Sequence, residues 1–294
     1  MKIIKYTGGL GNQMFQYAFQ YVLERKGFEV KADSSLYKKP HFRAGVDMSH
    51  GYFAVADVFG IDIKEASEKE IKRLGTSANT LFERVLKKFF RKPTHIVEYD
   101  SKYNSDNLTD TRDLYLDGYF QNLKYWIGCE DEIKKQFAFK LSLNEKSKEF
   151  SALLNSIKNK TCAIHVRRGD YLNHPTLFVC DKKYFENAIS KMIELCPQIE
   201  KFVIFSDDIE WCKSNLDTHG KEKLFVDWNR DKESWQDIAL MTECSNIIIP
   251  NSSFSFWGAF LNKNPDAKVI CPEIWSTTGV KDQIVSDWIT VPVV

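Results

Sequence analysis

The chain has 294 residues, and its 41 basic and 40 acidic side chains leave a formal net charge of +1. This length exceeds what one hydrophobic core usually serves, so two domains are expected. With 43% hydrophobic and 28% charged residues, the composition excludes a disordered or fibrous chain, and the balanced charge excludes a basic field for nucleic acid.

Three features of the sequence indicate the cellular compartment of the protein: the N-terminus, the length of the apolar runs and the cysteines. The apolar stretch at the N-terminus is too short for a signal peptide, and no apolar run approaches the roughly 20 residues of a membrane span. Seven cysteines without a Cys-x-x-Cys pair indicate buried free thiols rather than a disulfide framework. We therefore expect a cytoplasmic protein that touches at most the inner face of a membrane.

The first half of the chain begins as a strand, a turn and a helix. A short strand is expected over residues 3–6, a glycine turn over 8–11, and a helix from residue 12 to Gly27. Alternating side chains predict a second strand over 28–32. Later elements are, in chain order, exposed helices within 64–92, a strand at 114–116 and a helix within 141–160.

The second half alternates regularly between strands and helices. Strands are predicted at 162–166, 202–205, 224–226, 246–249 and 268–271, and helices at about 182–195, 208–215, 234–243 and 253–262. This alternation predicts a parallel sheet with helices on both faces. Such sheets bind ligands outside the carboxyl ends of their strands.

The glycine turn in the first half has two interpretations that the sequence leaves open. Gly9 and Gly11 lie between a strand and a helix, where backbone N–H groups can meet an anion; alternatively, they only permit a tight turn. No Walker motif follows, and Met14 stands where a dinucleotide fingerprint requires its third glycine. The polar pair Asn12 and Gln13, opening an otherwise apolar helix, favours a binding site.

Residues His165 to Asp170 leave an apolar strand at its carboxyl end. Burying Arg167 and Arg168 there is costly unless an anion meets them, and a guanidinium can bind a pyrophosphate with two hydrogen bonds. Asp170 can orient one of the arginines from behind. The alternative is a structural Arg–Asp ion pair, but the strand-end position favours an anion site.

A polar cluster opens the helix expected after the strand at 246–249. Asn251, Ser252 and Ser253 are ordinary N-cap residues. One cap suffices, however, and several hydroxyls at the positive end of a helix are also how a phosphate is held. We predict phosphate binding here, with one residue also capping the helix, and include Phe254 among the substrate contacts.

Three acidic residues lie at helix starts, and the sequence alone does not decide whether each is structural or binds the substrate. Asp237 follows Ser234 with the spacing of a capping box, yet a carboxylate can also accept the two N–H donors of a guanine edge. Asp207 and Asp208 can bind ribose hydroxyls or complement a helix dipole, and the structural role is favoured for Asp208. The histidines are scattered and no Asp-x-Asp is evident at a strand end, so no metal site is predicted.

Four motifs together resemble those of the inverting α-1,2-fucosyltransferases, in the bacterial branch of that family. They are GGLGNQMFQYA at 8–18, HVRRGDY at 165–171, FSDD at 205–208 and NSSFSFWG at 251–258. The resemblance implies a GT-B-like α/β fold of two Rossmann-like domains. Residues 1–155 would form the acceptor-side domain, and residues 156–294 would bind GDP-fucose.

The resemblance also implies roles for individual residues. The arginine matching Arg167 holds the β-phosphate, and the residues matching His165 and Asp237 contact guanine. The serines of the last motif reach the pyrophosphate. The candidate substrate-binding residues are therefore Gly9, Gly11, Asn12, Gln13, His165, Arg168, Asp170, Asp207, Asp237, Asn251, Ser252, Ser253 and Phe254. The candidate catalytic residues are Arg167 and, as possible general bases near strand ends, Asp33 and Asp117.

The implied reaction transfers L-fucose from GDP-β-L-fucose to the 2-hydroxyl of a terminal galactose, with inversion and without a metal or other cofactor. The acceptor would be a galactose-terminated oligosaccharide or a lipid-linked glycan, and no nucleic-acid partner is expected. The alternatives are fucose transfer to a protein or a chitin-like sugar, use of another GDP-sugar, and a non-catalytic nucleotide- or glycan-binding protein.

Overall fold

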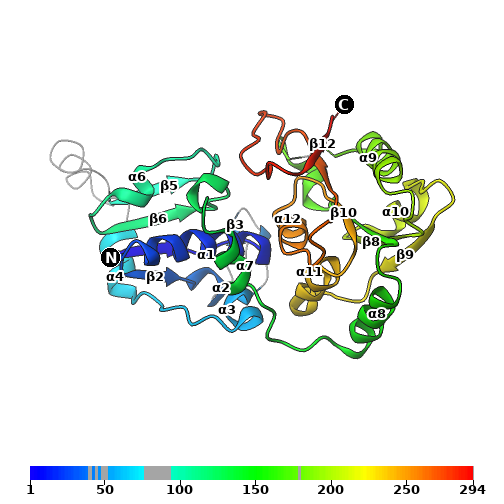
Figure 1. Cartoon of the computed structure of the whole chain (residues 1–294). Helices are drawn as coiled ribbons and strands as arrows, with labels where there is room; N and C mark the ends of the chain where they lie inside the picture. The colour runs from blue at the N-terminus through cyan, green and yellow to red at the C-terminus, as the bar shows by residue number, and fades with distance from the viewer. Residues whose placement is uncertain (39–41, 44–45, 48–51, 76–93, 178–179, 294) are drawn as a thin grey trace. The chain divides into compact units, whose positions relative to one another are not determined.

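The computed structural model describes residues 1–38, 42–43, 46–47, 52–75, 94–177 and 180–293 (Figure 1). The chain divides into two compact units, Met1–Lys140 and Leu141–Val294. Each unit has its own sheet and is described by itself. Within the described residues, no helix combines the length and the apolar character needed to cross a membrane.

The first unit is built on a four-stranded parallel sheet. Its strands are β1 (Lys2–Lys5), β2 (Val30–Asp33), β5 (His95–Glu98) and β6 (Leu114–Gly118), in the spatial order β2-β1-β6-β5. A separate short antiparallel pair consists of β3 (Phe42–Arg43) and β4 (Val46–Asp47). The strand order reverses between β1 and β6, so the carboxyl ends of these two strands form a topological switch point.

Helices and aromatic side chains complete this unit. The helices are α1 (Leu10–Arg25), α2 (Ser35–Lys38), α3 (Ala54–Phe59), α4 (Glu68–Gly75), α6 (Asp106–Thr109) and α7 (Glu130–Gln136). Phe19 of α1 stacks on Phe120 with ring centroids 4.2 Å apart. Helix α4 packs Leu74 against Ile3 and Tyr115, which lie on one face of the sheet. Helix α4 confirms part of the helical prediction for 64–92; residues 76–92 lie outside the described residues.

The second unit is built on a six-stranded parallel sheet. Its strands are β7 (Thr161–Val166), β8 (Lys201–Ser206), β9 (Glu222–Val226), β10 (Asn246–Ile248), β11 (Val269–Pro272) and β12 (Ile289–Val291). Their spatial order is β12-β11-β10-β7-β8-β9, and every neighbouring pair is parallel. This is the doubly wound arrangement of a nucleotide-binding domain, with its switch point between β7 and β10.

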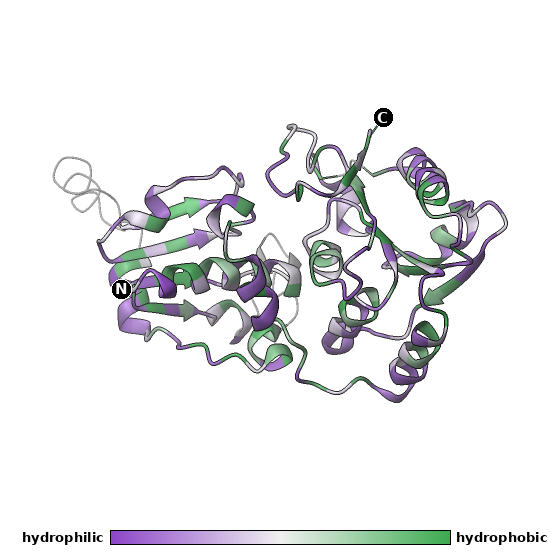
Figure 2. Ribbon diagram, in the orientation of Figure 1, coloured by the Kyte–Doolittle hydropathy of each residue, from purple (hydrophilic) through white to green (hydrophobic). Residues whose placement is uncertain are grey.

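Helix α8 (Glu145–Ser156) precedes the first of these strands, and α9 (Lys182–Leu195), α10 (Ile209–Asn215), α11 (Trp235–Met241) and α12 (Ser253–Phe260) connect the strands that follow. Buried side chains of α9, such as Phe185 and Ile189, pack with Ile164 of β7 and Ile204 of β8. Figure 2 shows hydrophobic colour along the strands and both colours on α8 and α9, as expected for helices that bury one face.

The α/β class and the two Rossmann-like sheets of a GT-B-like protein are confirmed. The predicted domain boundary after residue 155 lies inside α8, whereas the structure groups all of α8 with the second unit. Polar contacts explain the difference: the Asn144 backbone N–H donates to Gln236 Oε1 over 2.8 Å, and the Ser151 hydroxyl donates to Glu243 over 2.5 Å. These contacts and the buried Leu154 fix α8 to the second sheet.

Candidate functional site

The carboxyl ends of β7 and β10 meet at the switch point of the second sheet. Ile164 of β7 pairs with Ile248 of β10, so the residues that follow the two strands emerge side by side. The His165 and Phe254 rings lie 5.7 Å apart, and Tyr171 donates a hydrogen bond to the Asn251 carbonyl over 3.4 Å. The fold therefore brings together the two motifs predicted to form the donor site.

Arg167 follows β7 and is held by two carboxylates. Its Nη2 lies 2.7 Å from Asp170 Oδ1, and its Nη1 lies 3.0 Å from Asp207 Oδ2. The predicted contact with Asp170 is thus present. The side chain is 36% exposed. A guanidinium has five N–H donors, so two carboxylate contacts leave further donors for an incoming anion.

Arg168, next in sequence, has a different environment. Its Nε lies 3.0 Å from Asp208 Oδ2, and its guanidinium lies 4.2 Å from the centre of the Trp211 ring. The side chain is only 17% exposed. A guanidinium stacked on an indole and paired with a carboxylate is an anchor. Arg168 therefore fixes the turn to helix α10, and its contact with the substrate stays a prediction.

The two acidic residues that follow β8, Asp207 and Asp208, contact the turn that contains Arg167 and Arg168. Asp208 caps α10 by accepting a hydrogen bond from the Trp211 backbone N–H over 3.1 Å, which is the structural role favoured from the sequence. Asp207 accepts a hydrogen bond from the Arg168 backbone N–H over 2.9 Å, in addition to its pairing with Arg167. A Cβ on Gly169 would lie 2.7 Å from Asp207 Oδ2, so a larger residue there would displace the Asp207 carboxylate. Asp207 therefore positions both arginines, and its contact with a ribose stays a prediction.

The start of α12 differs from an ordinary capped helix. Ser252 occupies the N-cap position, but its side chain makes no cap hydrogen bond, contrary to the expectation that one residue also caps. Asn251 is buried, and its Nδ2 donates to the carbonyls of Leu177 and Trp275, both over 2.8 Å. Asn251 therefore clamps two loops together, and the other polar residues of this helix start are Ser252, Ser253 and Ser255.

His165 is a buried, neutral imidazole. Burial, together with the nearby positive charge of Arg167, lowers its pKa to about 3. Its Nδ1 is buried and makes no hydrogen bond within the part of the chain that the structure describes. A buried ring nitrogen without a partner is unusual in a folded protein.

Asp237 lies in the first turn of α11. The capping-box interpretation is wrong, because Ser234 makes no side-chain cap hydrogen bond. Instead, Asn229 donates a hydrogen bond to Asp237 Oδ1 over 2.8 Å. Burial raises the pKa of the carboxyl group to about 7, and the hydrogen bond from Asn229 opposes that shift. Asn229 was not predicted from the sequence, since an asparagine in a loop carries no pattern.

The candidates at the glycine turn lie in the first unit, around Gly9 and Gly11 at the start of α1. Gln13 is fully buried: its Nε2 donates to the Gly8 carbonyl over 3.1 Å, and its Oε1 accepts from the Ala54 backbone N–H over 2.8 Å. Asn12 accepts a hydrogen bond from Gln121 over 2.8 Å. The Gln13 amide therefore holds the turn, and its contact with the substrate stays a prediction.

The two candidate general bases of the first unit, Asp33 and Asp117, have different surroundings. Asp33 is buried, and its two oxygens accept hydrogen bonds from the Tyr115 hydroxyl over 2.7 Å and the Ser35 backbone N–H over 3.0 Å. Asp117 pairs with Lys5 over 3.0 Å and accepts a hydrogen bond from the Tyr99 hydroxyl. Asp33 is thus enclosed by its own fold, whereas Asp117 belongs to a cluster with partly exposed members.

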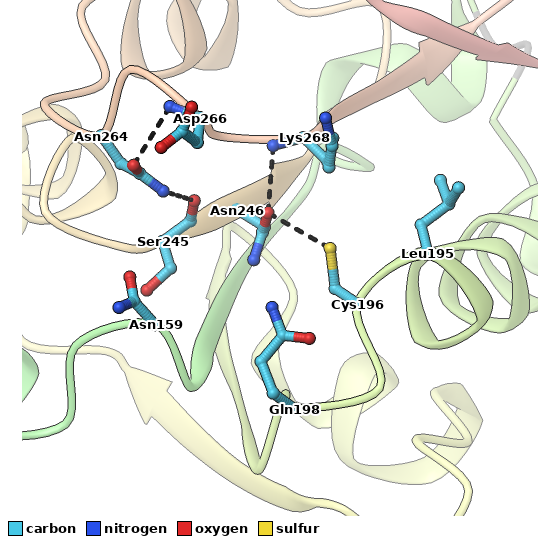
Figure 3. A pocket seen from close by; sticks show the side chains of 9 residues that line it. All are labelled: Asn159, Leu195, Cys196, Gln198, Ser245, Asn246, Asn264, Asp266 and Lys268. Atoms are coloured by element: carbon cyan, nitrogen blue, oxygen red, sulfur yellow. Dashed lines mark hydrogen bonds between the residues drawn. The ribbon is translucent and has the colours of Figure 1, made fainter.

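A separate cavity of about 370 Å³ lies at the opposite, amino-terminal edge of the second sheet (Figure 3). Its amide side chains serve the surrounding loops: Asn246 Oδ1 accepts from the Lys268 backbone N–H over 3.0 Å, and Asn264 Nδ2 donates to the Ser245 carbonyl over 2.8 Å. This cavity is not part of the arginine site. Among the described residues, no group of three His, Cys, Asp or Glu side chains is arranged to hold a metal ion.

Comparison with known proteins identifies the family. The profile of glycosyl transferase family 11 matches residues 67–291, well over half of the chain. The chain therefore belongs to this family and is a fucosyltransferase-like glycosyltransferase.

Three similar proteins show which glycosyltransferases the chain resembles. The chain is 29% identical to an alpha-1,2-colitosyltransferase of Escherichia coli, over 93% of this chain and 91% of the relative. It is 30% identical to the O-antigen biosynthesis glycosyltransferase WbnK of Escherichia coli, over 96% and 98%. It is also 29% identical to human galactoside alpha-(1,2)-fucosyltransferase 1, over 53% of this chain and 46% of that protein.

Proposed function

We propose that the chain transfers L-fucose from GDP-β-L-fucose to the 2-hydroxyl of a terminal galactose, with inversion and without a metal. The observation that carries the proposal is Arg167, held by two carboxylates at the switch point beside the uncapped start of α12. The galactoside alpha-(1,2)-fucosyltransferase among the relatives supports fucose as the sugar and galactose as the acceptor. The O-antigen relative supports an oligosaccharide or lipid-linked glycan.

Donor binding follows from the charges and donors at the second sheet. Arg167 and the serine-bearing start of α12 would hold the pyrophosphate, since a guanidinium and a helix N-terminus both favour negative charge. Asp237 would accept the two N–H donors of the guanine edge, and the neutral ring of His165 would lie against the base. Asp170 and Asp207 would keep Arg167 in place throughout the reaction.

The reaction is a single displacement at C1 of fucose. The bond between C1 and the β-phosphate oxygen breaks, and its electron pair stays on departing GDP, while the acceptor oxygen bonds to C1 from the opposite face. Negative charge therefore develops on the leaving phosphate, beside Arg167. Fixed donors at such a position typically contribute on the order of 10²–10³ in rate.

The decisive experiment is incubation of the purified protein with GDP-fucose and a panel of galactosides, with and without EDTA. We expect α-1,2-linked fucosyl products, identified by linkage analysis, at rates that EDTA does not change. Loss of activity in EDTA would contradict the metal-free mechanism. GDP binding without any turnover would favour the non-catalytic alternative.

A second donor is favoured by one observation, the alpha-1,2-colitosyltransferase aligned over 93% of the chain. Colitose differs from fucose in lacking one ring hydroxyl, so both GDP-linked sugars fit the same nucleotide site. Competition between the two donors at equal concentration separates these functions. Preferential transfer of colitose would replace fucose in the proposal and leave the GDP site unchanged. The seven free cysteines support a cytoplasmic location for either reaction.

A further inference from the structure

The polar side chains around Asn229 form a hydrogen-bond network that leads from helix α8 to Asp237. Asn229 follows β9 and is buried. Its Oδ1 accepts hydrogen bonds from Asn144 Nδ2 and from the Ser147 hydroxyl, both over 3.1 Å, while its Nδ2 donates to Asp237 Oδ1 over 2.8 Å. All four residues belong to the second unit, so the network is complete within that unit.

The partners of the Asn229 amide fix its orientation. Asn144 Oδ1 accepts from the Ser147 backbone N–H over 2.8 Å, so the Nδ2 of Asn144 faces Asn229. The Ser147 hydroxyl accepts from Trp228 Nε1 over 2.9 Å and directs its own proton to Asn229 Oδ1. Both lone pairs of that oxygen are therefore used. A flipped amide would place N–H groups against these donors, so the amide nitrogen of Asn229 must face Asp237.

The Asp237 carboxylate depends on this one donor. Within the described ranges, Asn229 is the only side chain that hydrogen-bonds it, and the bond goes to Oδ1. A donor at this distance stabilises the ionised form, so it opposes the rise that burial causes in the pKa of Asp237. A carboxylate has about four acceptor positions, which leaves others for a ligand.

Other charges near Asp237 contribute less to its ionisation. Arg230, next in sequence to Asn229, also favours the ionised form, but its side chain is exposed. Helix α12, which packs beside α11, carries no charged residue. The charged residues of α8 and of the segment before α11 are all exposed to solvent, which screens them. They are Glu145, Lys146, Lys148, Glu149, Asp227, Asp231, Lys232 and Glu233.

We propose that Asn229 is a positioning residue for guanine recognition: its amide, oriented by α8, keeps the Asp237 carboxylate ionised and turned to accept the two N–H donors of the base. This inference rests on the proposed function, in which Asp237 binds guanine. A protonated carboxyl group has only one acceptor oxygen free of hydrogen, and its own O–H would meet an N–H of the guanine edge. Asn229 thus determines over which pH range the site prefers guanine.

Calorimetric titration of Asn229→Ala with GDP at pH 7.0 and 8.5 tests the proposal. Asp237 has a pKa of about 7 in the wild type, and loss of one charged hydrogen bond should raise it by about one to two units. The variant should therefore bind GDP roughly 5- to 50-fold more weakly than wild type at pH 7.0, and at most about fourfold more weakly at pH 8.5. Dividing each affinity by that of Asp237→Asn in the same buffer removes the titration of the diphosphate.

Asn246→Ala is the matched control. Asn246 is also a buried asparagine of the second unit, at the amino end of β10. Its Oδ1 likewise accepts two hydrogen bonds, from the Lys268 backbone N–H over 3.0 Å and from Cys196 Sγ over 3.6 Å. The control should lower the thermal midpoint without changing how GDP affinity depends on pH.

Two further variants test whether Asn229 acts through Asp237. Ser147→Ala removes one of the two donors that orient the Asn229 amide, so it should shift the pH dependence in the same direction by a smaller amount. The double variant Asn229→Ala, Asp237→Asn should bind GDP as weakly as Asp237→Asn alone, because the carboxylate that Asn229 serves is already absent.

The outcomes separate this inference from the proposed function. An Asn229→Ala protein whose GDP affinity falls equally at pH 7.0 and 8.5, or matches that of Asn246→Ala, overturns the inference alone. If Asn229→Ala does not fold, an unshifted pH dependence in Ser147→Ala overturns it. A wild-type protein that does not bind GDP overturns the proposed function and this inference together.

Discussion

Replacing Asp237 by asparagine is the most direct test of the guanine site. The carboxylate is held by one hydrogen bond from Asn229, and burial raises its pKa to about 7. A guanine edge presents two N–H donors, which the ionised carboxylate accepts and the protonated form does not. GDP binding should therefore favour ionisation of Asp237 and release a proton below pH 7.

The magnitudes follow from that pKa. GDP affinity should fall about tenfold per pH unit well below pH 7, and roughly 30-fold between pH 8.5 and 5.5. Asparagine loses the charge and turns a donor toward the base, which removes one or more charged hydrogen bonds of about 1.5–3 kcal/mol. At pH 8.5, Asp237→Asn should therefore bind GDP roughly 10- to 150-fold more weakly.

Protein stability should respond to pH with the opposite sign. Because the folded pKa of about 7 exceeds the ordinary value of 3.8, the folded chain holds this proton more tightly than the unfolded chain. The contribution of Asp237 to stability is therefore greatest below pH 3.8 and is lost as the pH rises to 7. In the absence of GDP, Asp237→Asn should accordingly melt at a higher temperature than wild type at pH 8.

Calorimetric titration with GDP at pH 5.5, 7.0 and 8.5 measures these effects. The terminal phosphate of GDP itself titrates near pH 6, so the residual slope in Asp237→Asn gives the phosphate's share. Inosine diphosphate, which lacks one N–H donor of guanine, is the ligand control and should discriminate less between the two proteins. Equal affinities and equal pH slopes for wild type and Asp237→Asn would refute the assignment of Asp237 to guanine.

Two further predictions concern one residue of each unit. Arg167→Lys keeps the positive charge but loses the forked N–H donors, so kcat/KM should fall by a factor on the order of 10²–10³. The thermal midpoint should not change. Near-normal turnover would contradict the assignment of Arg167 to the pyrophosphate. Burial raises the pKa of Glu98 to about 8 from an ordinary 4.5, so this carboxyl group costs stability as the pH rises between those values. Glu98→Gln should thus melt higher than wild type at pH 8 and equally at pH 4, and equal melting at both pH values would contradict this account.

The strands and helices of the second unit were predictable because each strand is a buried apolar run and each helix buries one face. Four strands were missed: the two-residue strands β3 and β4, and also β5 and β12, which lack that signal. β12 has only three residues, and the middle one, Thr290, is exposed. β5 carries polar side chains at both ends, His95 and Glu98, and gains its identity from pairing with β6. The periodicity of a sequence indicates which side chains of a segment are buried. It does not indicate that the segment pairs with a strand distant in sequence.

The position of the proposed donor site follows from the sequence for a related reason. Motifs that follow parallel strands must emerge at the same edge, so the sequence order of strands and helices already places Arg167 near Ser252. The partner of each side chain was not predictable. Asn251 was expected at a phosphate and instead bridges the carbonyls of Leu177 and Trp275, residues separated from each other by most of the second sheet's sequence. Spacing cannot reveal a contact that tertiary folding creates.

The two adjacent arginines of the motif at 165–171, Arg167 and Arg168, have different roles because tertiary contacts give them different partners. Both arginines lie after the end of β7, and they take different partners: Asp170 and Asp207 for Arg167, and Asp208 for Arg168. Arg168 stacks on Trp211 and pairs with Asp208, both about 40 residues away, and it thereby ties the turn to the next strand–helix unit. That anchor leaves the backbone of the turn fixed while Arg167 remains at the rim. Arg168 thus keeps the turn rigid beside Arg167, the residue that we propose binds the pyrophosphate.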